Sequence, residues 1–256
     1  MLLVAAAYAE GPYQATGFKV GEVTDSTAII WTRLTLKAKP NPLTAPTLTF
    51  NYSGGATFQP DLRERPKHPP TRLNGIKYAT EGGANDIRYA APGVAGEVRV
   101  LYSTEIKEAR QTIKNTLWQA VDAKEDFTRQ FKLTGLHPDT RYAVVVETRR
   151  MDGAMGQKLV GSFKTAPADK QVAQVVFAVS TGQTFRHQDR PDGFEIYPSI
   201  LKLNPSFFVH TGDIIYYDGL AKSKNLAHWH WQRMYSLPTN VDFHRQVASY
   251  FIKDDH

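Results

Sequence analysis

Residues 206–218 read Ser206-Phe207-Phe208-Val209-His210-Thr211-Gly212-Asp213-Ile214-Ile215-Tyr216-Tyr217-Asp218. The apolar run near the start of this stretch is typical of a strand that is buried on both faces. Gly212 ends the strand, and Asp213 is the first carboxylate after it. Ligands of open α/β sheets bind at the carboxyl ends of the strands. The stretch therefore predicts a strand of a parallel sheet that presents Asp213 and Tyr216 at its end.

The flanking segments predict the rest of that sheet. Residues 172–179 form a nearly continuous apolar run, as expected of another strand buried on both faces. Residues 194–203 carry apolar side chains at helical spacing, and Asn204-Pro205 ends this helix because the residue before a proline avoids the α region. Strand–helix–strand is the repeating unit of a parallel sheet. The sequence also predicts a second helix and a third strand, over residues 226–235 and 247–252.

Polar side chains gather at the ends of the three predicted strands, in residues 180–183, 212–218 and 254–256. Two of these ends carry carboxylates, one adds His256, and the middle one adds Tyr216. Carboxylate, phenol and imidazole groups at neighbouring strand ends are the ligands of hydrolytic metal sites. We interpret His210, which lies inside the strand, as a hydrogen-bonded core histidine rather than a ligand.

Residues 17–166 have a different sequence pattern, in which short strand signals alternate with turn signals. This pattern predicts an all-β sandwich of the fibronectin or immunoglobulin type. Residues 133–142 resemble the corner of such sandwiches where a tyrosine hydroxyl bonds the backbone upstream, which makes Tyr142 that tyrosine. Trp31 is predicted to be a large core residue of the early strands. Residues 51–93 are rich in Gly, Pro and charged residues, and they predict long loops.

The charge of the chain does not favour nucleic-acid binding. The formal net charge is +6, yet the residues from Gln171 onward hold eight Lys or Arg and eight Asp or Glu. The excess lies in the first part of the chain, without a dense basic run, as on an ordinary solvated surface. The chain has no cysteine, which excludes disulfides, thiolate metal sites and a cysteine nucleophile.

The first nine residues, Met1-Leu2-Leu3-Val4-Ala5-Ala6-Ala7-Tyr8-Ala9, look like the tail of a secretory signal with a small-residue cleavage site. An apolar first strand is the alternative. With the first interpretation, residues 1–16 are a signal remnant and leader, and the protein is secreted or periplasmic. No stretch reaches the roughly 18 apolar residues that a membrane span needs.

Two blocks carry a resemblance to a known family. Gly212-Asp213-Ile214-Ile215-Tyr216 resembles the G-D-x-x-Y block of the metallophosphoesterase superfamily. Phe251-Ile252-Lys253-Asp254-Asp255-His256 resembles the block in which PhoD-like alkaline phosphatases carry two aspartates and a histidine. A β-sandwich in front of the catalytic domain is that family's architecture. The resemblance thus covers essentially the whole chain.

The resemblance implies a phosphoric ester hydrolase, acting on mono- or diesters, in which metal ions activate the attacking water. Asp213 would bridge two metals, Tyr216 would bind a ferric ion as phenolate, and Asp255 would be a further metal ligand. Iron and calcium are the implied metals. His256 would contact the substrate phosphate and protonate the leaving group, together with Asp255 in the catalytic set. Arg233 is a candidate contact to phosphate, and Asp254 would orient His256.

Two departures from the family qualify this prediction. Gly182 stands where the family has a cysteine ligand, so the ferric site is incomplete. The ligands of the superfamily's second half are expected beyond His256, so residues 171–256 would be the first, incomplete part of an α/β metallophosphatase domain. The alternative hypothesis is a catalytically degenerate phosphatase scaffold that acts as a binding module.

Overall fold

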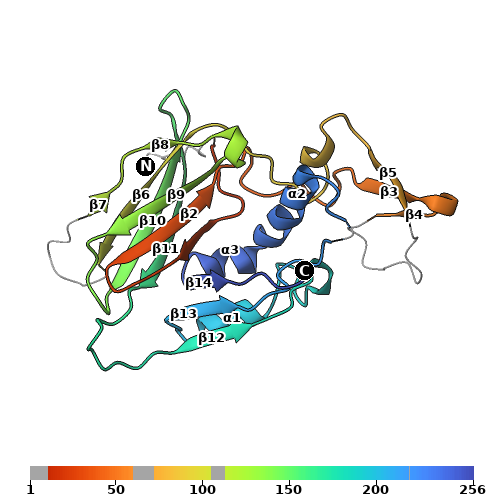
Figure 1. The fold of residues 1–256 in the computed structure, drawn as a ribbon. Helices are drawn as coiled ribbons and strands as arrows, with labels where there is room; N and C mark the ends of the chain where they lie inside the picture. Colours follow the sequence, from red (N-terminus) through yellow and green to blue (C-terminus); the bar gives the residue numbers. More distant parts are fainter. Residues whose placement is uncertain (1–10, 60–71, 105–112, 219) are drawn as a thin grey trace, which may run out of the picture.

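The computed structural model describes residues 11–59, 72–104, 113–218 and 220–256. Residues 1–10, where the sequence predicts an export signal, lie outside the described part. Two antiparallel sheets form the first part of the fold (Figure 1). One sheet has the strand order β1-β2-β9 and contains Phe18–Gly21, Thr27–Arg33 and Thr128–Thr134. The other has the order β11-β10-β6-β7, with β8 also paired to β6; its strands β6, β7, β8, β10 and β11 are Glu97–Thr104, Lys114–Asn115, Gln119–Ala120, Arg141–Arg149 and Met155–Lys164.

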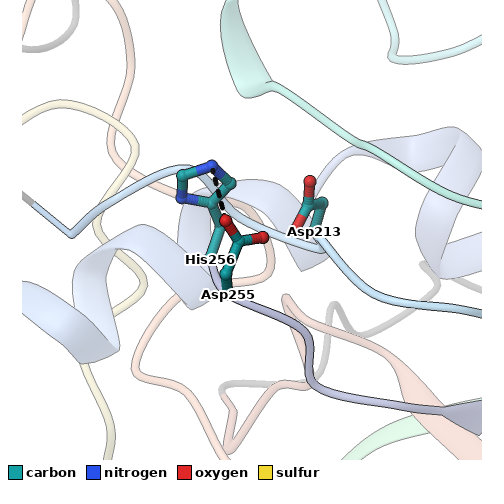
Figure 2. A group of neighbouring side chains, drawn as sticks. All are labelled: Asp213, Asp255 and His256. Atoms are coloured by element: carbon teal, nitrogen blue, oxygen red, sulfur yellow. Dashed lines mark ion pairs between the residues drawn. The ribbon is translucent and has the colours of Figure 1, made fainter.

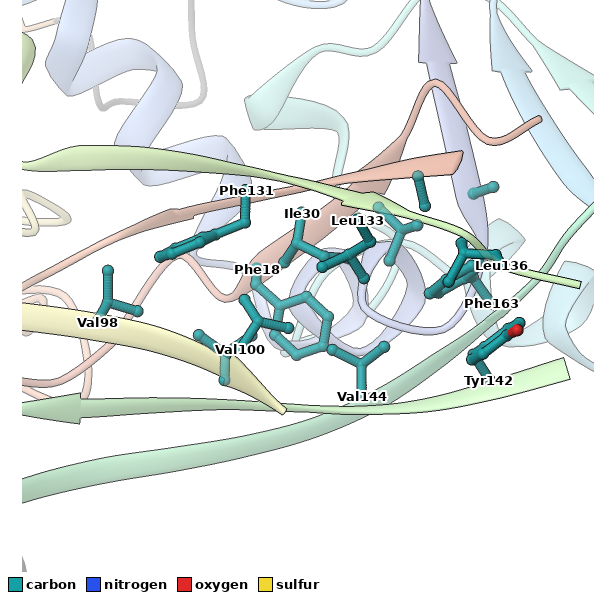
Figure 3. Packing of buried hydrophobic residues seen from close by; sticks show 14 of the residues in the cluster. Phe18, Ile30, Val98, Val100, Phe131, Leu133, Leu136, Tyr142, Val144 and Phe163 are labelled. Carbon is teal, nitrogen blue, oxygen red and sulfur yellow. The ribbon is translucent and has the colours of Figure 1, made fainter. Parts of the chain in front are cut away.

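The core of the sandwich lies between these two sheets, where apolar side chains from both of them point into the same gap (Figure 3). In β10, Tyr142, Val144 and Val146 alternate with more exposed neighbours, as the period of two in a strand requires. Ala28 and Ile30 of β2 face them from the other sheet. The predicted β-sandwich is thereby confirmed.

Tyr142 occupies the corner that the sequence predicts. Its hydroxyl accepts a hydrogen bond of 2.8 Å from the backbone N–H of His137, and its ring stacks on Phe163 at a centroid distance of 5.4 Å. The side chain is 4% exposed. The hydroxyl therefore satisfies a backbone donor at the edge of the apolar core.

Trp31 is not a core residue, so that prediction was wrong. In β2 the inward positions are Ala28, Ile30 and Thr32, which leaves Trp31 on the opposite, outer face of the sheet. Size and aromaticity suggested burial, but the alternation of the strand decides which face a side chain takes.

The prediction of long loops over residues 51–93 was also wrong in part. A small third sheet has the order β4-β3-β5, in which β3, β4 and β5 are Leu48–Tyr52, Thr57–Phe58 and Leu73–Tyr78. Its apolar face packs with Leu226 and Trp229 of a helix that is distant in sequence. That long-range contact explains why a segment with weak local signals still forms strands.

The second part of the fold is a parallel sheet with the order β12-β13-β14, whose strands are Phe177–Ser180, Phe207–His210 and Ala248–Phe251. Three helices accompany it: α1 (Ile196–Leu201), α2 (Lys224–Tyr235) and α3 (Pro238–His244). The Ser223 hydroxyl caps α2, and a proline starts α3. Helix α3 was not predicted. None of the helices in the described ranges is long and apolar enough to cross a membrane.

Strand β12 differs from its prediction. It spans only four residues, and Phe177 and Val179 are 56% and 54% exposed. Within the described residues β12 pairs with β13 alone, so it is an edge strand rather than one buried on both faces. The continuous apolar run from residue 172 is therefore hydrophobic, but its side chains are not buried in the structure.

The sandwich and the parallel sheet touch through backbone. A Cβ atom at Gly161 of β11 would lie 2.0 Å from the carbonyl oxygen of Arg245, so only glycine allows this approach. The next residue, Ser162, donates its N–H to the same carbonyl at 2.9 Å. The Tyr250 hydroxyl of β14 donates to the Val23 carbonyl at 3.0 Å and accepts from the Val23 N–H at 3.1 Å. The two parts are thus fixed to each other by hydrogen bonds to main-chain atoms, one of them between two main-chain groups and two of them with the Tyr250 hydroxyl.

Replacing Tyr142 by phenylalanine should lower the free energy of unfolding by about 1 kcal/mol, because the His137 N–H loses its partner at a partly buried site. Urea denaturation of both proteins measures the difference. Tyr52→Phe is the matched control, since no hydrogen bond of its hydroxyl is seen among the described residues. An unchanged midpoint in Tyr142→Phe would contradict the corner assignment.

His230 in α2 predicts a pH effect. It is fully buried, and burial together with the neighbouring guanidinium of Arg233 lowers its pKa to about 2. Below about pH 6.5 the unfolded chain binds a proton at His230, whereas the folded chain does not. The free energy of unfolding is therefore highest above that pH and decreases as the pH falls. His230→Gln should remove about one proton, or about 1.4 kcal/mol per pH unit, from the slope of unfolding free energy between pH 6 and 4.

Denaturant titrations at several pH values give that slope. His187→Gln, at an exposed position, is the control and should leave the slope as in the parent protein. Equal slopes in His230→Gln and the parent would refute the assignment.

Candidate functional site

The three strand ends that the sequence singles out meet at one edge of the parallel sheet. Thr211 donates its backbone N–H to Ser180 O at 2.9 Å, and Gln183 donates to Asp213 O at 2.8 Å. On the other side, Ile252 donates to His210 O at 3.0 Å. The loops after β12, β13 and β14 are therefore tied side by side.

Gly212 is required by the closeness of these loops. Its φ of 123° is a conformation that side chains disfavour, and a Cβ atom there would lie 2.4 Å from the Cβ of Asp254. Asp213, the next residue, also has a positive φ, of 52°. The backbone turn thus directs Asp213 toward the loop that follows β14.

The side chains of Asp213, Asp255 and His256 come together at this edge (Figure 2). Each offers one ligand atom, and these atoms all lie within 4.8 Å of one another. The His256 Nε2 atom lies 3.9 Å from Asp255 Oδ2. Asp255 is exposed, whereas Asp213 and His256 are partly buried.

Tyr216 joins the same group. Its hydroxyl donates a hydrogen bond of 2.8 Å to Asp213 Oδ2, and its ring centroid lies 4.4 Å from that of His256. The hydrogen bond to Asp213 raises the pKa of the Tyr216 hydroxyl, and Asp255 and Asp254 add to this effect. The phenol is therefore protonated in the metal-free protein.

Asp218 is a site residue that the sequence did not reveal. Its Oδ2 lies 2.7 Å from His256 Nδ1, and this hydrogen bond is the main reason why the pKa of His256 is raised. From the sequence, Asp254 was expected to orient His256, whereas in the structure Asp218 makes the hydrogen bond to the ring. The only signal was that Asp218 is a second carboxylate in the stretch from Gly212 to Asp218.

Arg233 lies apart from this group. It is 4% exposed, and its guanidinium packs over Phe185 and Trp229 at 4.6 and 4.3 Å from the ring centroids. Its Nη2 is also 2.9 Å from His230 Nδ1. These contacts hold the side chain in the helix packing, and a role in phosphate binding stays a prediction.

A cleft of about 800 Å³ opens beside Tyr216. The loop after β12 forms one wall, and Arg186 and His187 contribute two cationic or potentially cationic side chains that sequence reasoning missed. His210 lines the cleft from β13; it is 1% exposed, and its Nδ1 has no hydrogen-bond partner in the described part of the chain. The burial predicted for His210 is confirmed, and burial lowers its pKa, while a hydrogen bond with the Gly212 backbone acts in the opposite direction.

The donor set fits a hard cation. The Oδ1 atom of Asp213 is buried and has no hydrogen-bond partner within the described residues, which is costly for a carboxylate unless an ion satisfies it. Carboxylate oxygens are typical ligands of Ca²⁺ and Mn²⁺, and iron also accepts imidazole and phenolate ligands. The described ranges contain this one group of three such residues, and Gly182 adds no side-chain ligand to it.

Comparisons with known proteins give a structural match. No family model matches the sequence, and no curated protein matches it. A solved structure of PhoD matches with a TM-score of 0.60 and 17% identity, covering 100% of this chain and 40% of the PhoD chain. This chain has a PhoD-like fold. It spans two fifths of the length of that neighbour.

Two further structures are similar at a lower level. The purple acid phosphatase PPD1 from yellow lupin (Lupinus luteus) seeds has a TM-score of 0.46 and 12% identity, over 93% of this chain and 35% of that one. The third fibronectin III domain of a human protein has a TM-score of 0.30 and 14% identity, over 68% of this chain and 96% of that domain.

Proposed function

We propose that this chain is part of a metal-dependent phosphoric ester hydrolase of the PhoD-like type, with a β-sandwich ahead of the first part of an α/β metallophosphatase domain. The observation that carries the proposal is that two carboxylates, Asp213 and Asp255, meet beside the imidazole of His256, with one polar atom of each within 4.8 Å of the others. The group lies at the carboxyl edge of a parallel sheet, where such folds bind their ligands.

Asp213 and Asp255 would hold the cation, and Tyr216 would bind it through its hydroxyl oxygen after losing the proton now donated to Asp213. A bound metal ion would polarise the phosphoryl oxygens and lower the pKa of a water molecule. Iron and calcium remain the metals that the family resemblance suggests. The cleft beside Tyr216 would receive the phosphate ester, with Arg186 placed to contact the phosphate.

His256 would act as the proton donor. Asp218 accepts a hydrogen bond from His256 Nδ1, which leaves Nε2 as the nitrogen that delivers a proton to the leaving oxygen. The same carboxylate raises the pKa of His256 and so favours the protonated ring that donation requires. Removing the Asp218 carboxylate would therefore have two effects: the His256 ring would lose its fixed orientation, and its pKa would fall.

Gly182 favours a second candidate, a phosphatase scaffold that has lost catalysis and acts as a binding module. Its φ of 63° and missing side chain leave the loop after β12 without a ligand atom at this position. Stoichiometric metal with hydrolysis of p-nitrophenyl phosphate or its bis-ester supports the enzyme. Metal binding without hydrolysis in the protein that contains the whole phosphatase domain supports the binding module.

The Asp213→Asn variant tests the metal site in this chain alone. It should weaken Mn²⁺ binding by at least about tenfold, because one charged ligand is removed from a small set. Isothermal titration calorimetry and Mn²⁺ electron paramagnetic resonance give the affinities. Asp169→Asn, at an exposed loop position, is the control and should bind as the parent does. Equal affinity in Asp213→Asn would remove Asp213 from the ligand set.

Gly182→Cys tests whether residue 182 faces the same cation. A Cβ atom there would lie 3.5 Å from the Tyr216 hydroxyl oxygen, and the thiol would be the only one in the chain. Cobalt(II) should then give a thiolate charge-transfer band that the parent lacks. Gly182→Ala shares the strain at positive φ, about 1–2 kcal/mol, and supplies no sulfur. Bound cobalt without that band in Gly182→Cys would separate residue 182 from the metal.

A further inference from the structure

A second cleft, of about 790 Å³, lies between the outer face of the β1-β2-β9 sheet and the elements α2 and β14. Its volume is in the range of pockets that bind small molecules. None of the residues that line it belongs to the group around Asp213. The side chains that matter here are Lys19, Trp31, Trp231, Tyr235 and Phe251.

Lys19 is one of the basic side chains that line this cleft, together with Arg33, Lys124 and Lys224. Its Nζ lies 4.6 Å from the ring centroids of both Trp31 and Tyr235, so the ammonium sits between an aromatic side chain of the sandwich and one of α2. It donates one hydrogen bond, of 3.3 Å, to the Thr16 carbonyl. An ammonium has three donors, and one long bond leaves this group poorly satisfied.

The Lys19 ammonium also lacks a counter-ion. In the described ranges no carboxylate forms an ion pair with it, although Glu22, Glu125 and Asp126 also line the cleft, and Arg33 adds a like charge. Arg33 is itself paired with Asp126 at 2.9 Å, so Asp126 is already engaged. Burial and Arg33 both lower the pKa of Lys19, to about 7. An anion in the cleft would relieve this unfavourable electrostatic environment.

The walls of the cleft are flat and apolar. Trp231 stacks on Tyr235 with a centroid distance of 5.7 Å and an interplanar angle of 9°, yet it remains 37% exposed. Phe251 is 38% exposed. Exposed aromatic side chains that gather in a concave surface offer a stacking surface for a planar apolar group.

We propose that this cleft binds a small planar aromatic acid, whose anionic group pairs with the Lys19 ammonium and whose ring stacks on Trp231. The combination of the Lys19 ammonium, which has no ion-pair partner among the described residues and lies between two rings, with a set of exposed aromatic side chains selects this chemistry over a neutral aromatic or an aliphatic acid. The proposal is independent of the phosphoesterase function, because it uses no residue of the Asp213 group.

The whole 256-residue chain can be tested with two matched probes, 2-naphthoate and 2-naphthalenemethanol, which share the ring and differ in charge. Ligand-observed NMR titration at pH 6 gives both dissociation constants. We expect 2-naphthoate to bind about tenfold more tightly than the alcohol, as a charge-assisted hydrogen bond predicts.

Lys19→Met keeps the apolar stem between the two rings and removes the charge. It should abolish the preference for the acid and leave the alcohol's affinity unchanged, while Trp231→Ala should weaken both probes several-fold. Lys77→Met, at an exposed position in β5, is the control and should retain the preference. If Lys19→Met does not fold, the probe ratio in the parent and the Trp231→Ala variant still decide.

The proposal is overturned if the parent binds neither probe, if it binds both equally, or if a folded Lys19→Met variant still prefers the acid. It is also overturned if Trp231→Ala binds both probes as the parent does, because the naphthalene ring of the probe would then not stack on Trp231.

Discussion

The parallel pairing of β13 with β12 and β14 is the constraint on which the site depends. Its register places Ser180 beside His210 and His210 beside Phe251, so the loops that follow the three strands begin at the same level. A slip of one residue would turn each side chain to the opposite face. Gly212 then allows two of these loops to approach so closely that a Cβ atom would not fit. The strand register and the close approach at Gly212 thus bring the loops that carry the carboxylates together.

This arrangement concentrates negative charge. Asp213, Asp254 and Asp255 all act electrostatically on Tyr216, and one buried oxygen of Asp213 has no hydrogen-bond partner in the described part of the chain. Like charges at short range are unfavourable unless cations or donors compensate them. His256 and its partner Asp218 supply part of the compensation at the rim. In the proposed function a metal ion supplies the rest, and it converts an unfavourable cluster into a site for phosphate chemistry.

The features that the sequence predicted well are those encoded by local patterns. The corner tyrosine, Tyr142, follows from a short motif, and Asp213 follows from an apolar run that ends in glycine. The features it missed depend on partners distant in the chain. Asp218 meets His256 across 38 residues, and β3 to β5 exist because α2 covers them. Trp31 was assigned to the core on its size, although strand alternation places it on the outer face beside Lys19. Hydrophobicity alone also misjudged β12, because the exposure of its side chains depends on what packs over the faces of the sheet.

The main-chain contact at Gly161 has a consequence for how this architecture can change over time. A side chain of any size at that position would collide with a carbonyl oxygen of the segment between α3 and β14. Neighbouring residues cannot adjust around such a collision, because no rotamer moves a backbone atom. The sandwich is therefore not an interchangeable module that recombination can exchange for another of the same shape. A replacement sandwich would need a glycine at the matching register to dock in the same way.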